Sequence, residues 1–166
     1  MAAHSRSAKL VVHTASAAAT HEWGRRLGER LAAGDFVALC GPLGAGKTCF
    51  VQGLGEGLGV VGRITSPTFI IIRHHPGAVP LCHADAYRVG GPDELEDAGL
   101  LECLGQAVVA LEWAERTRGL WPDDLYLVEL SLENEGRRLA ISGLGADPEQ
   151  IVNELRDALT GTRDIR

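Results

Sequence analysis

One eight-residue segment constrains the fold of this chain more than any other feature of the sequence. The segment Gly41-Pro42-Leu43-Gly44-Ala45-Gly46-Lys47-Thr48 satisfies the pattern G-x-x-x-x-G-K-[ST]. It follows the short apolar run 36–40, which is typical of a buried parallel strand. A loop of this kind joins a strand to a helix, so the motif predicts an α/β domain with a strand, a phosphate loop and a helix in that order.

The residue types in this loop suit the binding of a triphosphate. Glycines allow backbone N–H groups to turn toward phosphate oxygens, and the N-terminus of the following helix adds partial positive charge. Lys47 is suited to neutralising the β- and γ-phosphates, and the Thr48 hydroxyl can coordinate Mg²⁺. Only two of the 16 basic residues are lysines, and the others are arginines. One of the two lysines stands in this loop, where a compact ammonium suits the site better than a wide guanidinium. We therefore expect the chain to bind a nucleoside triphosphate with Mg²⁺.

Four glycines at positions 53, 55, 57 and 59 follow the loop. Their spacing differs from G-x-G-x-x-G and they follow a helix rather than a strand, so a dinucleotide-binding loop is a poor alternative. Glycine costs about 1 kcal/mol per interior helix position relative to alanine. The sequence therefore predicts that the helix starting at Lys47 ends early or frays.

Hydrophobic periodicity and turn residues predict the other elements. Strands are expected at residues 9–13, 69–73, 79–84, 107–111, 125–132 and 137–141, with turns at 74–77 and 134–136. Helices are expected at residues 17–33, with Gly34 as the stop, in short turns across 92–105, and after a cap at Asp147. Residues 1–7 resemble a disordered tail. The sum is a single P-loop domain, residues 1–166, with a mixed parallel and antiparallel sheet flanked by helices.

Two carboxylates are candidates for the metal site. Glu112 ends the apolar run 107–111, where a parallel strand would deliver it beside the phosphate loop. Asp85 ends a weaker apolar run. A phosphoryl-transfer site needs a carboxylate near Mg²⁺, and the spacing alone leaves open which of the two contacts the metal. Either could instead be a solvated residue at the end of a strand.

Composition limits the possible partners. The formal net charge is −6 and no basic run exists, which argues against nucleic-acid binding by this chain alone. No apolar stretch approaches the roughly 20 residues of a membrane span, and no signal-peptide core is evident, so a cytoplasmic location is expected. None of the four cysteines forms a C-x-x-C pair, so the sequence indicates neither a zinc site nor a redox pair.

The motifs taken together resemble the TsaE family, also called YjeE. The resemblance rests on residues 44–48, Ser66-Pro67-Thr68-Phe69, His83-x-Asp85-x-Tyr87-Arg88 and Glu112-Trp113, in that order. Members of this family are the ATPase component of bacterial threonylcarbamoyladenosine synthesis on tRNA, at the adenosine next to the anticodon. The resemblance implies an ATP hydrolase that is weak alone and acts on a TsaB–TsaD pair.

The resemblance also implies roles for individual residues. Gly41, Gly44, Ala45, Gly46, Lys47, Thr48 and Cys49 would cradle the phosphates. Thr48 and Glu112 would hold Mg²⁺, and Asp85, with Lys47, would act near the γ-phosphate. Ser16 and Gly136 would contact the nucleotide from the N-terminal segment and the last hairpin. Ser66-Pro67-Thr68 would form a switch-like loop.

Two other functions are compatible with the phosphate loop. A small-molecule kinase would need an Arg-rich lid over the transferred phosphate, and no obvious lid is present. A non-catalytic nucleotide switch would order residues 66–69 when ATP binds.

Overall fold

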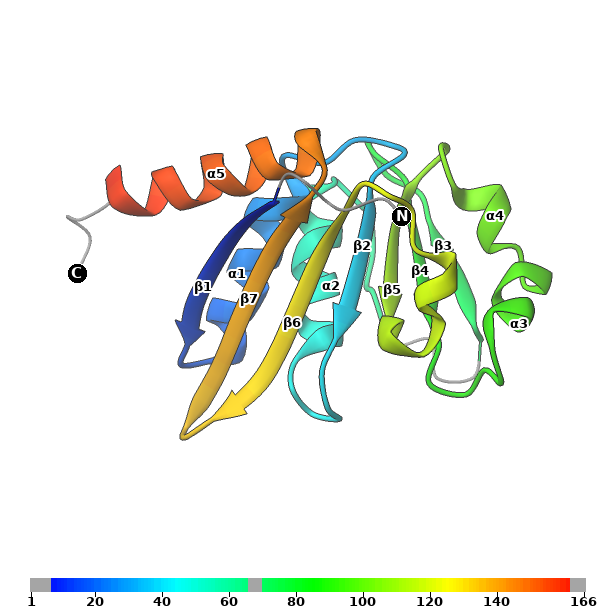
Figure 1. Ribbon diagram of the computed structural model, residues 1–166, viewed down its shortest axis with the longest axis horizontal. Coiled ribbons are helices and arrows are strands. Elements are labelled where there is room, and N and C mark those ends of the chain that lie inside the picture. Colours follow the sequence, from blue (N-terminus) through cyan, green and yellow to red (C-terminus); the bar gives the residue numbers. More distant parts are fainter. Residues whose placement is uncertain (1–6, 66–69, 162–166) are drawn as a thin grey trace.

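Seven strands form one mixed sheet in the order β1-β7-β6-β2-β5-β4-β3 (Figure 1), counted over residues 7–65 and 70–161, which the computed structural model describes. The central strands β6, β2, β5 and β4 run parallel, whereas β1, β7 and β3 pair antiparallel with their neighbours. This arrangement confirms the predicted α/β class and the mixed sheet. The strands are β1 (Ser7–Thr14), β2 (Phe36–Cys40), β3 (Ile72–His75), β4 (Leu81–Asp85), β5 (Val108–Glu112), β6 (Leu125–Glu133) and β7 (Gly136–Leu144).

Helices cover both faces of the sheet. In β5, Val108 and Ala110 belong to the buried cluster that includes α1 and α2, whereas Val109 and Leu111 belong to the cluster that includes α3 and α4. A parallel strand that is buried on both faces is apolar along its whole length, as this one is. The helices are α1 (Ala17–Gly28), α2 (Lys47–Gly57), α3 (Pro92–Asp97), α4 (Leu100–Cys103), the 3₁₀ helix η1 (Ala114–Leu120) and α5 (Ala146–Gly161).

The glycine-rich helix α2 does not end early, so that prediction is wrong. The helix runs through Gly53 and Gly57 because these positions lie directly against the backbone of α1. A Cβ atom at Gly53 would lie 1.9 Å from the carbonyl oxygen of His21, and one at Gly57 would lie 2.2 Å from that of Arg25. Larger residues would push the two helices apart.

The contact is reciprocal, because α1 also presents glycines to α2. A Cβ atom at Gly24 would lie 2.2 Å from the carbonyl oxygen of Phe50, and one at Gly28 would lie 2.3 Å from that of Leu54. Backbone therefore packs on backbone along the whole pair of helices. Packing lost by separating the helices outweighs the propensity cost of about 1 kcal/mol per glycine.

Helix α1 ends at Gly28, five residues before the predicted boundary at residue 33. Tight turns follow, in which Arg30 N donates to Leu27 O and Leu31 N donates to Gly28 O. Gly34, predicted as the helix stop, instead has φ +103° and turns the chain into β2. Its N–H donates to Ala107 O at 3.0 Å, which ties this turn to the start of β5.

The turn between β3 and β4 lies later than predicted. His74 and His75 were expected in the turn but belong to β3, where they pair with Cys82 and Leu81. The connecting residues are 76–80, with a proline at each end. Proline has no N–H to donate to a ladder, so Pro76 ends β3 and Pro80 stands just before the start of β4.

The start of the last helix differs from expectation, and the last hairpin agrees with it. Helix α5 begins at Ala146, one residue before the predicted cap at Asp147, and Glu149 N donates to Gly145 O. A Cβ atom at Gly143 would lie 2.2 Å from Pro148 O, so close packing on β7 fixes where this helix starts. The predicted hairpin is confirmed as β6 and β7.

Some expectations lie outside the described residues. These are the switch-like loop Ser66-Pro67-Thr68-Phe69 and the tail at residues 1–6; Ser7, assigned to the tail, is the first residue of β1. Among the residues that are described, no helix has both the length and the apolar character needed to cross a membrane.

Replacing Gly53 with alanine tests the role of the α1–α2 contact. Helix propensity alone would stabilise the variant by about 1 kcal/mol, but the clash with His21 O should lower the free energy of unfolding by about 1–3 kcal/mol. Urea denaturation measures the change. Gly55→Ala is the matched control, because its Cβ would meet only side-chain atoms, of which the flexible end of Ile64 is the nearest, and no backbone. A Gly53→Ala variant as stable as the parent would contradict the argument.

Candidate functional site

The predicted phosphate loop lies at the C-terminal end of the central strand β2. Three of its glycines have a positive φ, in the region that favours glycine. Gly41 has φ +147° and a Cβ atom there would lie 2.3 Å from Leu130 O. Gly46 has φ +105° and occupies the cap position of α2. The loop can therefore present backbone N–H groups and a helix N-terminus to a bound anion.

Lys47 is buried although its side chain carries a charge. Its ammonium donates to Gly41 O at 2.5 Å and to Pro42 O at 2.9 Å, and it lies 3.9 Å from the centre of the Trp113 ring. Burial lowers the pKa of Lys47, and the nearby Glu112 carboxylate opposes that shift. The side chain is thus held inside the loop rather than in solvent.

Thr48 and Glu112 form a direct contact across the start of α2 and the end of β5. Thr48 Oγ1 donates to Glu112 Oε1 at 3.0 Å, and the other carboxylate oxygen lies 2.5 Å from His83 Nε2. His83 and Glu112 are both buried. His83 therefore fixes the orientation of the carboxylate toward Thr48, in the manner of a residue that supports a metal ligand.

Asp85 is brought beside Glu112 by strand register, because the two residues are direct partners between β4 and β5. Burial raises the pKa of Asp85, while the hydrogen bond from Tyr87 N to Oδ1 at 2.8 Å opposes the shift. Trp113 follows Glu112 with φ +56°, and its ring lies 4.9 Å from that of Tyr87. These two rings form a wall beside the acidic residues.

A cavity of about 320 Å³ brings the predicted phosphate and metal residues together. Its lining combines the ammonium of Lys47, the hydroxyl of Thr48 and the carboxylates of Asp85 and Glu112. Hydroxyl and carboxylate oxygens are the hard donors that suit Mg²⁺, so this donor set fits that ion. The lining residues are Leu43, Gly44, Gly46, Lys47, Thr48, Cys49, Asp85, Tyr87, Glu112 and Trp113.

A second cavity, of about 230 Å³, shares Gly46 and Cys49 with the first. Ser16 and Gly136, which are far apart in the sequence, both line it together with Gly46 and Cys49. Ser16 also caps α1, because its Oγ accepts from Ala19 N at 3.1 Å. The lining residues are Thr14, Ala15, Ser16, Ala17, Thr20, Gly46, Cys49, Glu135, Gly136 and Arg137.

The sequence did not predict Arg137 as a site residue. Its guanidinium donates from Nη2 to Gly44 O at 3.1 Å, so the last hairpin contacts the phosphate loop directly. Residues 44 and 137 are 93 positions apart, and no local pattern signals such a contact. Of the predicted residues, Gly41 and Ala45 belong to the loop but do not line either cavity.

Comparison with known proteins identifies the family. A model of the family "Threonylcarbamoyl adenosine biosynthesis protein TsaE" matches residues 14–140. A tRNA threonylcarbamoyladenosine biosynthesis protein TsaE from Streptomyces coelicolor is 48% identical over 133 residues, which cover 75% of this chain and 90% of that protein. The protein of the same name from Treponema pallidum is 40% identical over 124 residues, covering 74% and 92%.

A solved structure shares the fold. The crystal structure of Bacillus subtilis YdiB matches with a TM-score of 0.76 and 29% identity, over 92% of this chain and 97% of that one. The sequence matches span the phosphate loop, both acidic strand ends and the start of the last hairpin. The chain therefore belongs to the TsaE family of tRNA threonylcarbamoyladenosine biosynthesis proteins.

Proposed function

We propose that this chain is a P-loop ATPase that binds ATP with Mg²⁺, hydrolyses it slowly, and thereby supports threonylcarbamoylation of tRNA by a TsaB–TsaD partner complex. The observation that carries the proposal is the single cavity lined by Lys47, Thr48, Asp85 and Glu112. It combines a cation for phosphate, oxygen donors for a metal and a further carboxylate. Family membership supplies the pathway.

The loop residues bind and orient the triphosphate in this proposal. Backbone N–H groups of Gly44, Gly46 and Cys49, which line the cavity, would face the phosphate oxygens, and the ammonium of Lys47 would balance their charge. The N–H of Ala45 instead donates to Pro42 O at 3.2 Å and holds the shape of the loop. Thr48 and Glu112 would hold Mg²⁺, which neutralises charge on the β- and γ-phosphates when it is bound. His83 keeps the Glu112 carboxylate turned toward Thr48.

Asp85 is proposed to orient the attacking water. It lies beside Glu112 at the edge of the cavity but has no hydrogen bond to Thr48 among the described contacts. Its carboxylate accepts from Tyr87 N, which leaves one oxygen for water. A buried carboxylate whose pKa is raised is also a better proton acceptor than a solvated one.

The second cavity is proposed to hold the rest of the nucleotide. Ser16 and Gly136 reach it from α1 and the last hairpin, and Gly46 and Cys49 belong to both cavities. A nucleotide with its phosphates in the loop could therefore extend into this space. Apolar groups such as Ala15 and Ala17 in the lining suit a base or ribose more than a charged group.

Slow hydrolysis follows from what the site lacks. No arginine is among the described residues that line the cavity around Lys47. P-loop enzymes gain about 10³- to 10⁵-fold from an arginine that stabilises the transition state, and this arginine is often supplied by a partner. The TsaB–TsaD pair is the proposed partner, and its binding should complete the site.

A phosphate-release assay with and without TsaB and TsaD tests the proposal as a whole. The chain alone should release phosphate slowly, and the partner pair should raise the rate at least tenfold. Equal and fast turnover in both conditions would overturn the partner-dependent mechanism. Transfer of labelled γ-phosphate to a metabolite would indicate a kinase, and retained ATP affinity without phosphate release in the complex would indicate a nucleotide switch.

Replacing Lys47 with alanine tests the loop. Charge-assisted contacts contribute about 1.5–3 kcal/mol, so affinity for ATP should fall by about 10- to 100-fold. Isothermal titration calorimetry measures the loss. Lys9→Ala is the matched control, because Lys9 is the only other lysine and is exposed on β1; unchanged ATP affinity in Lys47→Ala would refute the assignment.

The Glu112→Gln variant tests the metal site and keeps the shape of the side chain. ATP binding in the presence of Mg²⁺ should weaken at least tenfold, whereas binding in EDTA should change little, because only the former needs the carboxylate charge. Titration of ATP under both conditions gives the comparison. Glu129→Gln, at an exposed position of β6, is the control. If the affinity for ATP falls equally with and without Mg²⁺, Glu112 supports the structure of the site and does not hold the metal.

Asp85→Asn should separate activity from stability. Because burial raises the pKa of Asp85, its ionised form destabilises the folded state, so the neutral variant should melt at a higher temperature near pH 7. That gain should vanish below about pH 3.9, where the wild-type carboxyl is protonated in both states. Phosphate release by the Asp85→Asn variant should be at least tenfold slower than release by the parent chain. Lower stability at pH 7 together with full activity would contradict both roles.

A further inference from the structure

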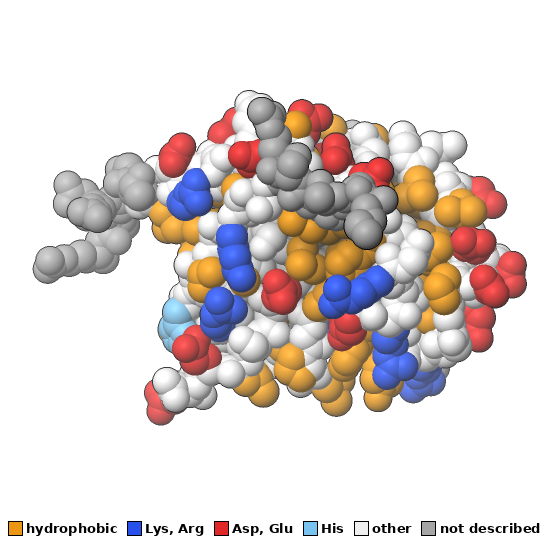
Figure 2. Space-filling view, in the orientation of Figure 1, with side chains coloured by type: hydrophobic (Ala, Val, Ile, Leu, Met, Phe, Trp, Pro, Cys, Tyr) orange, Lys and Arg blue, Asp and Glu red, His pale blue; other side chains and the backbone are white. Residues whose placement is uncertain are grey.

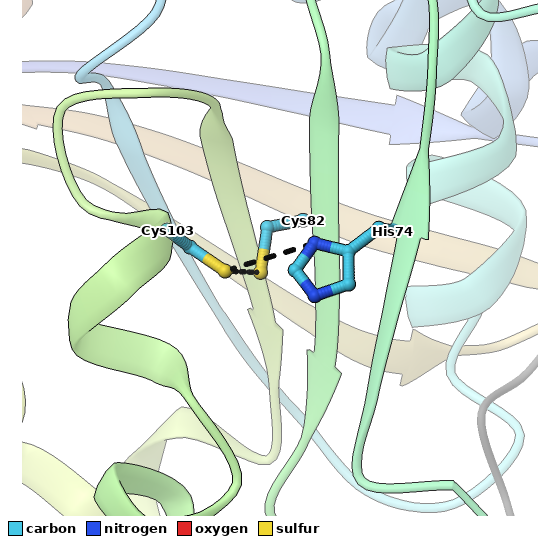
Figure 3. Close-up of side chains that lie close together, drawn as sticks. All are labelled: His74, Cys82 and Cys103. Atoms are coloured by element: carbon cyan, nitrogen blue, oxygen red, sulfur yellow. Dashed lines mark hydrogen bonds between the residues drawn. The ribbon is translucent and has the colours of Figure 1, made fainter.

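Three side chains that bind soft metals converge at the edge of the sheet opposite β1 (Figure 3). His74 on β3 lies directly across from Cys82 on β4, and Cys103 is the last residue of α4. The two sulfur atoms are 2.6 Å apart, and Cys103 Sγ lies 3.9 Å from His74 Nδ1. All three donor atoms lie within 4.8 Å of one another.

This cluster is separate from the phosphate-loop cavity. Successive side chains of a strand point to opposite faces of a sheet. His83 and Asp85 therefore share one face of β4 with the loop, whereas Cys82 points to the other face and packs in the cluster that contains Cys103. None of the three side chains has a part in the proposed hydrolysis.

We propose that His74, Cys82 and Cys103 form a binding site for a thiophilic divalent cation, with zinc as the best match. Thiolate sulfur and imidazole nitrogen are the ligands that zinc prefers. Each cysteine would lose its proton as its sulfur bonds to the metal, and the two protons would pass to solvent. Two thiolates and a neutral imidazole balance the charge of the ion.

Charge balance matters here because both cysteines are buried. Cys82 is 0% exposed and Cys103 is 4% exposed. A lone thiolate would be costly at such positions, whereas a neutral metal–dithiolate group is not. Zinc bonded at about 2.3 Å in tetrahedral geometry needs its sulfur ligands about 3.8 Å apart. The two sulfur atoms now lie 2.6 Å apart, so metal binding would require the Cys103 side chain, at the end of the four-residue helix α4, to move outward.

One of the three ligands is accessible from solvent. His74 is exposed, so it can accept a cation from solvent and pass it to the sulfurs. Acidic side chains gather over the neighbouring helices (Figure 2), and this negative field raises the local concentration of cations. They are the exposed residues Asp93, Glu94, Glu96, Asp97 and Glu102. Three protein ligands leave the fourth tetrahedral position for water.

The imidazole distinguishes this site from a simple disulfide pair. A disulfide needs only the two cysteines, but His74 also lies beside Cys103 with Nδ1 toward its sulfur (Figure 3). The three ligands come from β3, β4 and α4, so a bound ion would join three elements. A disulfide would join two of them.

Cobalt titration of the full chain tests the proposal. The chain is fully reduced with a phosphine and supplied with excess Mg²⁺, so that the Thr48–Glu112 site does not compete. One equivalent of Co²⁺ should produce sulfur-to-cobalt charge-transfer absorption, and one equivalent of Zn²⁺ should abolish it. Zinc should also raise the melting temperature.

Variants assign the ligands. Cys103→Ser should lower zinc affinity at least 100-fold, since loss of supporting residues alone costs 10- to 100-fold. His74→Gln changes an exposed side chain, so the variant should fold normally. Its affinity for zinc should still fall at least tenfold. Cys40→Ser, a change at a cysteine outside the cluster, should bind zinc as the parent does.

Two results would overturn the proposal. One is the absence of charge-transfer absorption in the reduced parent chain. The other is unchanged zinc affinity in both Cys103→Ser and His74→Gln. The pair is a disulfide instead if two observations are made together. The reduced chain takes up no metal, and the chain as purified has a mass two units below that of the reduced chain and yields a cross-linked pair of peptides that contain Cys82 and Cys103.

Discussion

The candidate site depends on two opposite charges that are buried at the C-terminal ends of the central strands β2 and β5. Lys47 and Glu112 are 5% and 3% exposed, and burying a charge is costly unless it is paired or hydrogen-bonded. The loop carbonyls hold the ammonium, while Thr48 and His83 hold the carboxylate. The loop, β4, β5 and α2 must therefore all be in place for either charge to be tolerated, so the fold and the site are specified together.

The α1–α2 contact places the start of α2, and hence the loop, relative to the sheet. Four glycines allow the two helix backbones to touch, and the cap residue Ser16 at the start of α1 then lies in the same cavity wall as Gly46 and Cys49. Larger side chains in place of these glycines would push the helices apart and would separate Ser16 from Gly46 and Cys49. The glycine-rich stretch thus has a packing role that helix propensity alone does not reveal.

Strand β4 serves both faces of the sheet. Residues 83 and 85 face the phosphate loop, and residue 82 faces α4 and the proposed zinc ligands. A metal at that second face would brace the strand that carries His83 and Asp85 without entering the nucleotide cavity. The two sites can therefore be altered independently, although they share a strand.

The sequence by itself determined the local chemistry of this protein. The eight-residue loop, its strand-to-helix context and the carboxylates at strand ends are short-range patterns, and so are the hydrophobic periodicity and turn residues of the last hairpin. The α/β class and the positions of β2, β5 and that hairpin followed from them. Helix ends were less predictable, because α1 and α2 end where their glycines stop packing against each other rather than where propensity changes. Only the tertiary structure brought Arg137 to Gly44, Ser16 to Gly136, and His74 and Cys82 to Cys103. These contacts join residues that are distant along the chain, and their distances are set by sheet order and helix packing, which no local pattern encodes.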